Sequence, residues 1–498
     1  MDAATHLLGG FAAALSLSNL GYALAGCVLG TLIGVLPGLG PAAGTAILIP
    51  LTFNLDPTGA IIMLCAIYYG AMYGGTITSV LINVPGEAAS VITCIDGHEM
   101  AKQGRGGVAL GVAAIGSFIG GSIAALLLTL MALPIARAAL QFGPPEFFAL
   151  MLLGLSLVTG LAGRSLLAAL MMTVLGLAIA MIGIDPVRGA PRFAFGLPEL
   201  YDGVEFVSVV MGLFGVSEVL LTLERPYREV IRTELRKLLP DRVEWRAALN
   251  AIWRGTGLGF LLGLIPGIGA IIPTFLSYIL ERRLAKRPER FGKGAIEGVA
   301  GPETANNAYA NSAMIPLLTL GIPSSPTIAV LMGAFIVNGL TPGPFLFQER
   351  PDLVWAVIAS FFIGNLILLV LNLPLVGLWA RLLYIPSHYL CVGVLLFCIV
   401  GAYSLKQSTF DIWLMLGFGI AGYLLRKIDF PLAPLILGLI LGPIMEKSLR
   451  TSLEISAGSY LIFIERPLCL GLLIVTLLVL ASAAFNLAPR EVREVELN

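Results

Sequence analysis

The stretch G-C-V-L-G-T-L-I-G-V-L-P-G-L-G, from Gly26 to Gly40, is apolar and ends in a Pro-Gly-x-Gly sequence. A second stretch, G-T-G-L-G-F-L-L-G-L-I-P-G-I-G, from Gly255 to Gly269, repeats the pattern. Six residues recur 229 positions apart: Gly26, Gly30, Gly34, Pro37, Gly38 and Gly40 match Gly255, Gly259, Gly263, Pro266, Gly267 and Gly269. A repeat of this kind indicates a duplicated structural unit. The sequence therefore predicts two structurally repeated halves, each with helix breaks or re-entrant hairpins.

The composition places both halves in a membrane. Of the 498 residues, 57% are hydrophobic and 12% are charged, whereas a soluble domain has about 25% charged residues. About 10–13 stretches are apolar enough to cross or enter a bilayer, and their continuous hydrophobicity excludes the alternating strands of a β-barrel. We therefore predict an all-α polytopic membrane protein. The 30 basic and 30 acidic residues balance, so nothing in the charge indicates nucleic acid as a partner.

Clusters of basic residues predict the orientation. Eight lie between Arg225 and Arg254 and six between Arg282 and Lys293, and the positive-inside rule places both clusters in the cytoplasm. Because only one apolar run, 255–280, separates them, we interpret that run as a hairpin that turns at Pro266–Gly269. The predicted organisation is a first membrane repeat (1–224), a basic cytoplasmic linker (225–254) and a second membrane repeat (255–498).

The helix breaks are the first candidate binding sites. Proline lacks a backbone donor and glycine accepts positive φ, so Pro-Gly-x-Gly interrupts a helix. Corresponding breaks in two halves are typical of substrate sites in secondary transporters. The alternative is a kink for packing, because glycine ladders also let membrane helices approach closely. The candidate substrate-binding residues here are Gly38, Gly40, Gly267 and Gly269.

Two proline turns provide further candidates. In L-I-N-V-P-G-E-A-A-S (Leu81 to Ser90) and G-I-P-S-S-P-T (Gly321 to Thr327), a proline follows an apolar stretch. Ser325 is placed as an N-cap before Pro326, and a helix N-terminus there would suit a carboxylate. An ordinary surface cap is the alternative. The candidate substrate-binding residues in these turns are Pro85, Gly86, Pro323, Ser324, Ser325 and Thr327.

The segment E-T-A-N-N-A-Y-A-N-S, from Glu303 to Ser312, carries a polar stripe. Glu303, Asn307 and Asn311 have i, i+4, i+8 spacing and share one helix face. We predict that Asn307 and Asn311 bind substrate, with interhelical hydrogen bonding as the alternative. Glu87 and Glu303 are the predicted ion-coupling residues, because a buried carboxylate can carry a proton or ligate a cation. Glu87 could equally lie at the membrane interface.

No enzyme or metal signature stands against a transport function. The chain has no P-loop sequence, and Asp96–Lys102 starts like H-E-x-x-H but has Lys102 in place of the second histidine. An intramembrane enzyme would need a catalytic dyad, and no convincing one is present. We predict a protein that is not an enzyme and that needs no cofactor besides a coupling cation, Na⁺ or H⁺.

Three stretches resemble one protein family: G-V-L-P-G-L-G-P (Gly34 to Pro41), Y-G-G-T-I-T-S-V-L-I-N-V-P-G-E (Tyr73 to Glu87) and G-P-E-T-A-N-N-A-Y-A-N-S (Gly301 to Ser312). They are similar to the large membrane subunit of the bacterial tripartite tricarboxylate transporters. The resemblance implies a multi-pass permease of the bacterial cytoplasmic (inner) membrane. Its implied partners are a small membrane subunit of about four spans and a periplasmic substrate-binding protein.

The resemblance also implies a substrate class. Uptake of a tricarboxylate such as citrate, or of a related organic carboxylate, would be driven by an ion gradient. A passive anion channel and a transporter for another small organic anion are the alternatives. The sequence does not distinguish Na⁺ from H⁺ coupling, nor one carboxylate from another.

Overall fold

The computed structural model describes residues 3–36, 38–161, 165–185, 189–224 and 237–484, which are almost entirely helical. Five of the described helices are long and apolar enough to cross a membrane, and shorter apolar helices accompany them. The predicted class, an all-α polytopic membrane protein with two structurally repeated halves, is confirmed. Pro37 and the 225–236 part of the predicted linker lie outside the described residues.

The first half contains ten α-helices in the described residues. They are α1 (Ala3–Ala14), α2 (Leu17–Val35), α3 (Gly40–Leu48), α4 (Pro57–Ile82), α5 (Val91–Lys102), α6 (Gly106–Ala139), α7 (Pro144–Leu161), α8 (Leu166–Ala180), α9 (Phe206–Val210) and α10 (Ser217–Glu224). Short 3₁₀ turns are η1 (Ile49–Thr52), η2 (Ala88–Ser90) and η3 (Pro198–Leu200), and a π-helical stretch, η4 (Met211–Val216), joins α9 to α10. Strand β1 (Gly183–Ile184) pairs antiparallel with β2 (Pro191–Arg192).

The second half follows a related order. Its helices are α11 (Arg242–Gly263), α12 (Ile271–Leu284), α13 (Glu297–Ser312), α14 (Met314–Leu320), α15 (Pro326–Val337), α16 (Leu346–Glu349), α17 (Pro351–Asn372), α18 (Val376–Leu382), α19 (Ser387–Lys406), α20 (Thr409–Lys427), α21 (Ala433–Ile455), α22 (Ile462–Glu465) and α23 (Pro467–Ala484), with a 3₁₀ turn η5 (Pro288–Arg290). Because α11 starts at Arg242, the end of the segment predicted as a linker is helical.

Each glycine ladder packs a broken helix against the long helix that follows it. The ladder glycines of α2 face the backbone of α4, and those of α11 face α13, with no room for a Cβ atom. After each ladder the chain reverses. Ile33 of α2 lies against Gly44 of α3, and Arg254 of α11 donates to Glu281 of α12 at 2.7 and 2.5 Å. The predicted hairpin at 255–280 is confirmed, and the first half contains a matching one.

The two halves run in opposite directions. Tyr68 of α4 lies close enough to Tyr309 of α13 for electrostatic interaction, and eight residues further along α4, Thr76 donates to Glu303, which precedes Tyr309. The two helices are therefore antiparallel. Because α4 and α13 follow equivalent hairpins and run parallel to α2 and α11, the repeat is inverted, as in many secondary transporters.

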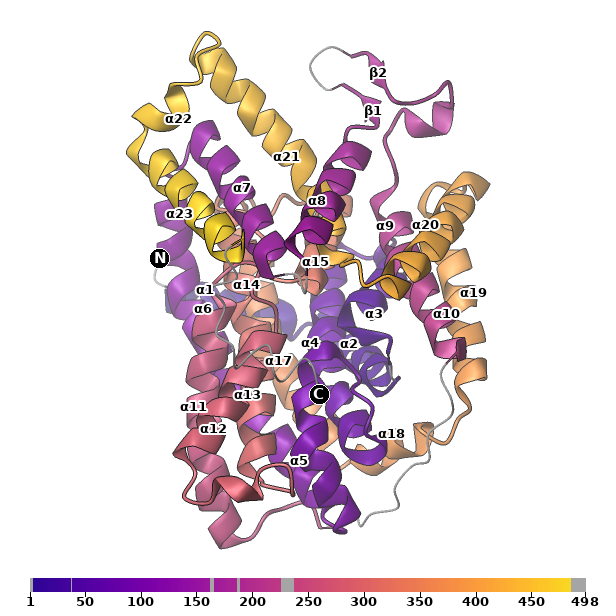
Figure 1. Ribbon diagram of the computed structural model, residues 1–498, viewed down its shortest axis with the longest axis vertical. Coiled ribbons are helices and arrows are strands. Elements are labelled where there is room, and N and C mark those ends of the chain that lie inside the picture. The colour runs from indigo at the N-terminus through magenta and orange to yellow at the C-terminus, as the bar shows by residue number, and fades with distance from the viewer. Residues whose placement is uncertain (1–2, 37, 162–164, 186–188, 225–236, 485–498) are drawn as a thin grey trace.

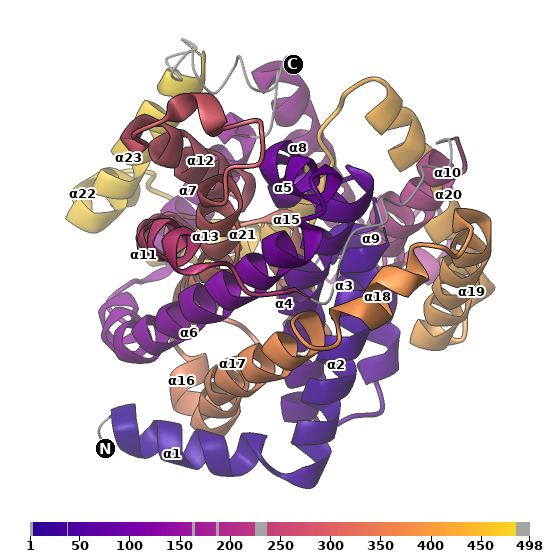
Figure 2. The ribbon, with the colours of Figure 1, turned by 90° about the horizontal axis from the view of Figure 1, so that it is seen from below.

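Helices α4 and α13 form the buried centre of the molecule. The membrane-spanning part of α4 is completely buried, and α13 is buried from its second residue onward. Helix α13 packs on α6 and α4 packs on α17, while α3 contacts α15 and α12 contacts η2. Each hairpin thus reaches the proline turn of the other half. Figure 2 shows α4 between α2 and α6, and Figure 1 places α7, α21 and α23 on one side and α10, α19 and α20 on the other.

The loop after α12 is fixed to the first half. Asp96 of α5 accepts hydrogen bonds at 2.8–2.9 Å from the backbone N–H groups of Gly292, Gly294 and Ala295 and from the hydroxyl of Tyr278. This contact lies at the lower end of the molecule in Figure 1, near α5 and α12. The segment that starts like a metalloprotease motif therefore anchors the basic loop.

Candidate functional site

Both glycines of each Pro-Gly-x-Gly break have positive φ. The φ angles are 96° and 62° at Gly38 and Gly40, and 83° and 70° at Gly267 and Gly269. Positive φ favours glycine, which has no Cβ, so the predicted breaks are confirmed. All four glycines are half-buried. Helices α3 and α12 begin at these breaks, and the first N–H groups of a helix have no partner within it.

The two proline turns also match each other. The residues that cap the C-terminal ends of α4 and α14, Asn83 (φ 53°) and Gly321 (φ 69°), are both left-handed. Each of these residues lies two positions before a proline, Pro85 or Pro323. A new helical segment follows each turn, η2 and α5 in the first half and α15 in the second. The structure therefore contains four breaks in two equivalent pairs.

Hydrogen bonds join the two breaks of the second half. The N–H of Gly269 and the hydroxyl of Tyr309 both donate to the carbonyl of Ser324, at 3.3 and 3.0 Å. Ser325 caps α15 by accepting the N–H of Ile328 at 3.3 Å, which confirms the predicted cap. Ser324, Ser325 and Thr327 are all buried, so this cap does not lie at the protein surface.

The turn of the first half packs on the first hairpin. Gly86 is buried against the backbone of Gly34 and Gly75, where a Cβ would meet both. This close approach needs glycine at position 86. Pro85 is half-buried beside it. The Pro85–Glu87 turn is therefore held against α2 and α4, as the Ser324 turn is held against the second hairpin.

The Glu87 carboxylate, which belongs to the first half, contacts the second half. Its Oε1 accepts from Nδ2 of Asn306 at 2.5 Å, and the side chain is only 7% exposed. Tyr68 lies near Glu87 and Tyr309. Within the described ranges, the Tyr68 hydroxyl and the Asn306 Oδ1 are buried without a hydrogen-bond partner. Polar atoms of this kind are rare in folded proteins, and these two are free to contact a ligand, an ion or a water molecule.

Glu303 is the second buried carboxylate of this region. Its Oε2 accepts from the hydroxyl of Thr76 at 2.6 Å, and its Oε1 accepts from the hydroxyl of Thr93. In the described part of the chain, neither Glu87 nor Glu303 has a basic side chain as an ion-pair partner. An unpaired buried charge costs several kcal/mol. The two carboxylates therefore need a cation or a proton.

The polar stripe of α13 faces α6. Nδ2 of Asn307 donates to Oγ of Ser117 at 2.7 Å, and Nδ2 of Asn311 donates to the carbonyl of Asn307 at 3.0 Å. Asn307 thus makes the interhelical hydrogen bond that was the alternative to substrate binding. The Oδ1 atoms of both asparagines are buried and have no partner in the part of the chain that the structure describes, which leaves two acceptors for a further ligand.

Sequence reasoning missed several residues of this site. Asn306 stands inside the quoted E-T-A-N-N segment, yet its place beside Glu87 depends on a contact between the two halves. Tyr68, Thr93 and Tyr309 gave no separate signal. Conversely, Gly38, Gly40 and Gly267 make no hydrogen bond to the other candidate residues within the described ranges; their part in the site is to start α3 and α12.

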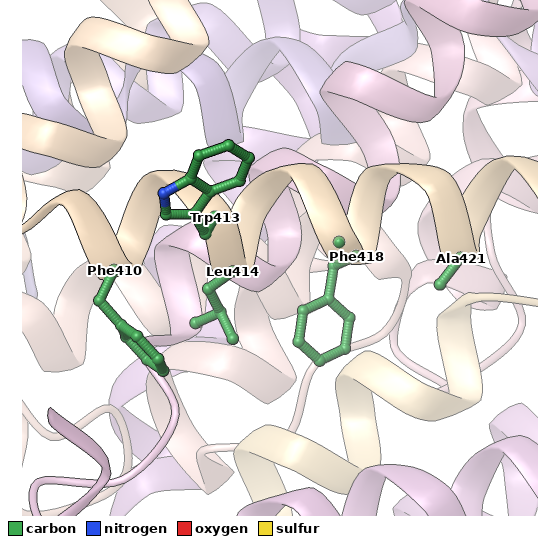
Figure 3. A pocket seen from close by; sticks show the side chains of 6 residues that line it. Phe410, Trp413, Leu414, Phe418 and Ala421 are labelled. Atoms are coloured by element: carbon green, nitrogen blue, oxygen red, sulfur yellow. The ribbon is translucent and has the colours of Figure 1, made fainter. Parts of the chain in front are cut away.

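The outer surface of α20 offers a cavity of different chemistry. A groove of about 410 Å³ is lined by Phe410, Trp413, Leu414, Gly417, Phe418 and Ala421 (Figure 3). Figure 3 shows Phe410, Leu414 and Phe418 projecting to the same side of the helix. No charged side chain lines this groove, so it does not suit a carboxylate. Among the described residues there is also no cluster of His, Cys, Asp or Glu that could hold a metal ion.

Comparisons with known proteins identify a transporter family and two relatives. A family model described as the tripartite tricarboxylate transporter TctA family matches residues 20–437. An uncharacterized 52.8 kDa protein in the TAR-I ttuC' 3' region of Agrobacterium vitis is 47% identical over 478 residues, which is 96% of this chain and 95% of the relative. A protein in the TAR-II ttuC' 3' region of the same organism is 48% identical over 215 residues, 43% of this chain and 89% of the relative. No solved structure matches the chain.

Proposed function

This chain belongs to the tripartite tricarboxylate transporter TctA family, and on that basis we propose that it imports a tricarboxylate or related organic carboxylate by ion-coupled secondary transport. Membership makes it a multi-pass membrane permease subunit of a tripartite transporter and implies a transporter rather than an enzyme. The substrate, the coupling ion and the partners are the proposed part.

The observation that carries the proposal is the meeting of broken helices at the buried α4–α13 contact. Four helical segments begin at the breaks, and helix N-termini attract anions through free N–H groups and about half a positive charge each. The segments 34–50, 73–90 and 303–330 contain no Arg or Lys. We therefore assign carboxylate binding to backbone N–H groups and neutral side chains.

The proposed substrate contacts are the residues of the four breaks and the adjacent polar side chains. They comprise Gly38, Gly40, Pro85, Gly86, Gly267, Gly269, Pro323, Ser324, Ser325, Thr327, Asn307 and Asn311. The unpartnered hydroxyl of Tyr68 and the side chain of Asn306 join this set because they lie beside Glu87. Hydroxyl and amide donors give a carboxylate about 1.5–3 kcal/mol per hydrogen bond. Asn307 would meet the substrate only through its Oδ1, as an acceptor, because its Nδ2 already donates to Ser117 and to the Glu303 carbonyl.

Glu87 and Glu303 are the proposed ion-coupling residues. Both are buried, and both accept only neutral donors in the described structure. A cation that enters with the substrate would compensate these carboxylates as well as the substrate charge. Na⁺ and H⁺ both meet this requirement, Na⁺ by coordination and H⁺ by protonation.

The proposed setting is the bacterial inner membrane with two partner proteins. The family resemblance supports a small membrane subunit of about four spans and a periplasmic binding protein that delivers the carboxylate. In this setting the basic segments 225–254 and 282–293 face the cytoplasm.

Uptake into proteoliposomes tests the proposal. The chain is reconstituted with its two partner subunits, and labelled citrate uptake is followed under an imposed Na⁺ or H⁺ gradient. We expect accumulation above the external citrate concentration with one of the two gradients. Uptake that only equilibrates citrate would indicate a passive anion channel, and uptake of a different organic anion alone would change the substrate class.

A further inference from the structure

We propose that a small cavity between α4, α6 and α17 binds an alkali cation such as Na⁺. Its volume is about 10 Å³, enough for one particle of the size of a water molecule. The polar part of its lining consists of Tyr73 and Thr76 from α4, Ser117 from α6 and Asn372 from α17. The remaining wall is apolar. The role of this cation in transport rests on the proposed function, but its binding does not.

Three hydroxyl groups of the lining can offer a ligand only lone pairs. A hydroxyl group whose hydrogen is engaged elsewhere acts only as an acceptor. Thr76 donates to Glu303 Oε2 at 2.6 Å, Tyr73 to Asn365 Oδ1 at 2.6 Å, and Ser117 to the Glu303 carbonyl at 3.2 Å. One of the two Nδ2 hydrogens of Asn372 donates to the Leu368 carbonyl at 3.0 Å.

Asn372 supplies independent evidence for a ligand. It is 4% exposed, and its Oδ1 has no hydrogen-bond partner among the residues that the structure describes. A water molecule would have to turn its two hydrogens toward these oxygens, whereas a cation is attracted by every oxygen that borders the cavity. A lining rich in acceptors therefore matches a cation better than water.

The charge around the cavity favours a monovalent ion. The Glu303 carboxylate accepts the hydrogen bond of the Thr76 hydroxyl, which lines the cavity. This carboxylate has no basic partner in the described part of the chain. Hard cations prefer hydroxyl, amide and carboxylate oxygens. With a single carboxylate nearby and otherwise neutral ligands, one positive charge balances the site. We therefore assign an alkali cation rather than Ca²⁺ or Mg²⁺.

The cavity connects to the proposed substrate site through α13. Ser117 accepts from Asn307 at 2.7 Å, and one turn separates Glu303 from Asn306, which holds Glu87. An ion in the cavity would thus fix α4, α6 and α13 in the arrangement that places Glu87 beside the breaks.

Thermal unfolding of the purified full chain in lipid nanodiscs tests cation binding without carboxylate or partner subunits. NaCl replaces choline chloride at constant ionic strength. We expect the melting temperature of the wild type to rise with Na⁺. Asn372→Ala should need at least tenfold more Na⁺ for the same rise, because it loses a direct oxygen ligand. Asn372→Asp keeps the oxygen and should keep the Na⁺ response.

Asn338→Ala is the matched control. The Asn338 amide also donates to the carbonyl four residues earlier, that of Ala334, at 2.8 Å, but it lies at the end of α15 and does not line the cavity. Its Na⁺ response should equal that of the wild type.

Two results would overturn the inference. One is a wild-type melting temperature that is the same in NaCl, LiCl, KCl and choline chloride, which would leave the cavity to water. The other is a wild-type Na⁺ response in folded Asn372→Ala. If Na⁺ binds as described but citrate uptake does not depend on Na⁺, the site stands and the proposed coupling to Na⁺ fails.

Discussion

Replacement of Glu303 by glutamine removes the negative charge beside the cavity with little change in shape. The two hydroxyl groups that donate to the carboxylate, those of Thr76 and Thr93, can rotate to meet an amide. We therefore expect Glu303→Gln to fold and to reach the membrane in normal amounts. Its affinity for Na⁺ should fall steeply.

The distances give the expected size of the effect. Oε2 of Glu303 lies 2.6 Å from the Thr76 hydroxyl oxygen, and a cation sits about 2.5 Å from an oxygen ligand, so charge and cation are roughly 5 Å apart. At an effective dielectric constant of about 20, Coulomb's law gives about 3.3 kcal/mol at this separation. Since about 1.4 kcal/mol corresponds to a tenfold change, the Na⁺ requirement should rise roughly a hundredfold or more.

The assay combines Na⁺-dependent thermal unfolding with the Na⁺ dependence of initial citrate uptake. Glu281→Gln is the control, because Glu281 is also buried (2% exposed) but pairs with Arg254 outside the site. This variant should melt at a lower temperature and keep the wild-type Na⁺ dependence. Glu303→Gln protein that is folded and binds Na⁺ as well as the wild type would refute the reasoning.

Three further predictions concern the cap, the topology and the glycine contacts. Ser325→Ala removes the cap and a hydroxyl donor and should weaken uptake at least tenfold at unchanged protein level. Ser325→Gly keeps a tolerable cap, so an equal loss of uptake in both variants indicates substrate contact. Wild-type uptake by both variants would exclude Ser325 from the site. Single cysteines at Arg246 and Arg290 should react with a membrane-impermeant maleimide from the cytoplasmic side only, and labelling of either from outside would contradict the predicted orientation. Gly86→Ala places a Cβ against the backbone of α2 and α4 and should strongly reduce the amount of folded protein on size-exclusion chromatography. In Gly40→Ala the new Cβ has open space, and the variant loses only about 1–2 kcal/mol to left-handed backbone strain. Equal yields of folded protein from the two variants would contradict the packing of Gly86.

The sequence predicted the features that depend on local chemistry. Pro-Gly-x-Gly disrupts a helix wherever it occurs, so the two hairpins could be predicted from the repeat alone. The two basic clusters predicted that both ends of the second hairpin face the cytoplasm, since one full span would have placed the clusters on opposite sides of the membrane. Ser325 before Pro326 predicted the start of α15 correctly for the same reason, because capping involves only neighbouring residues.

The site itself depends on contacts that no local pattern contains. The repeat did not reveal whether α4 and α13 run parallel or antiparallel, and the antiparallel arrangement is what brings Glu87 to Asn306. The stripe of α13 was predicted, but not its partner Ser117 on α6. Asn372, far from every motif, joins the site only because α17 packs beside α4 and α6.

Simultaneous measurement of labelled citrate and ²²Na⁺ uptake in one proteoliposome preparation, with both partner subunits present, tests the central claim most directly. The account predicts that the two labels enter together in a fixed ratio. It also predicts that Glu303→Gln and Asn372→Ala reduce both in parallel. Citrate accumulation that proceeds at the normal rate in the absence of Na⁺, with no ²²Na⁺ entering beside it, would contradict the coupling of carboxylate transport to Na⁺ at the α4–α13 contact.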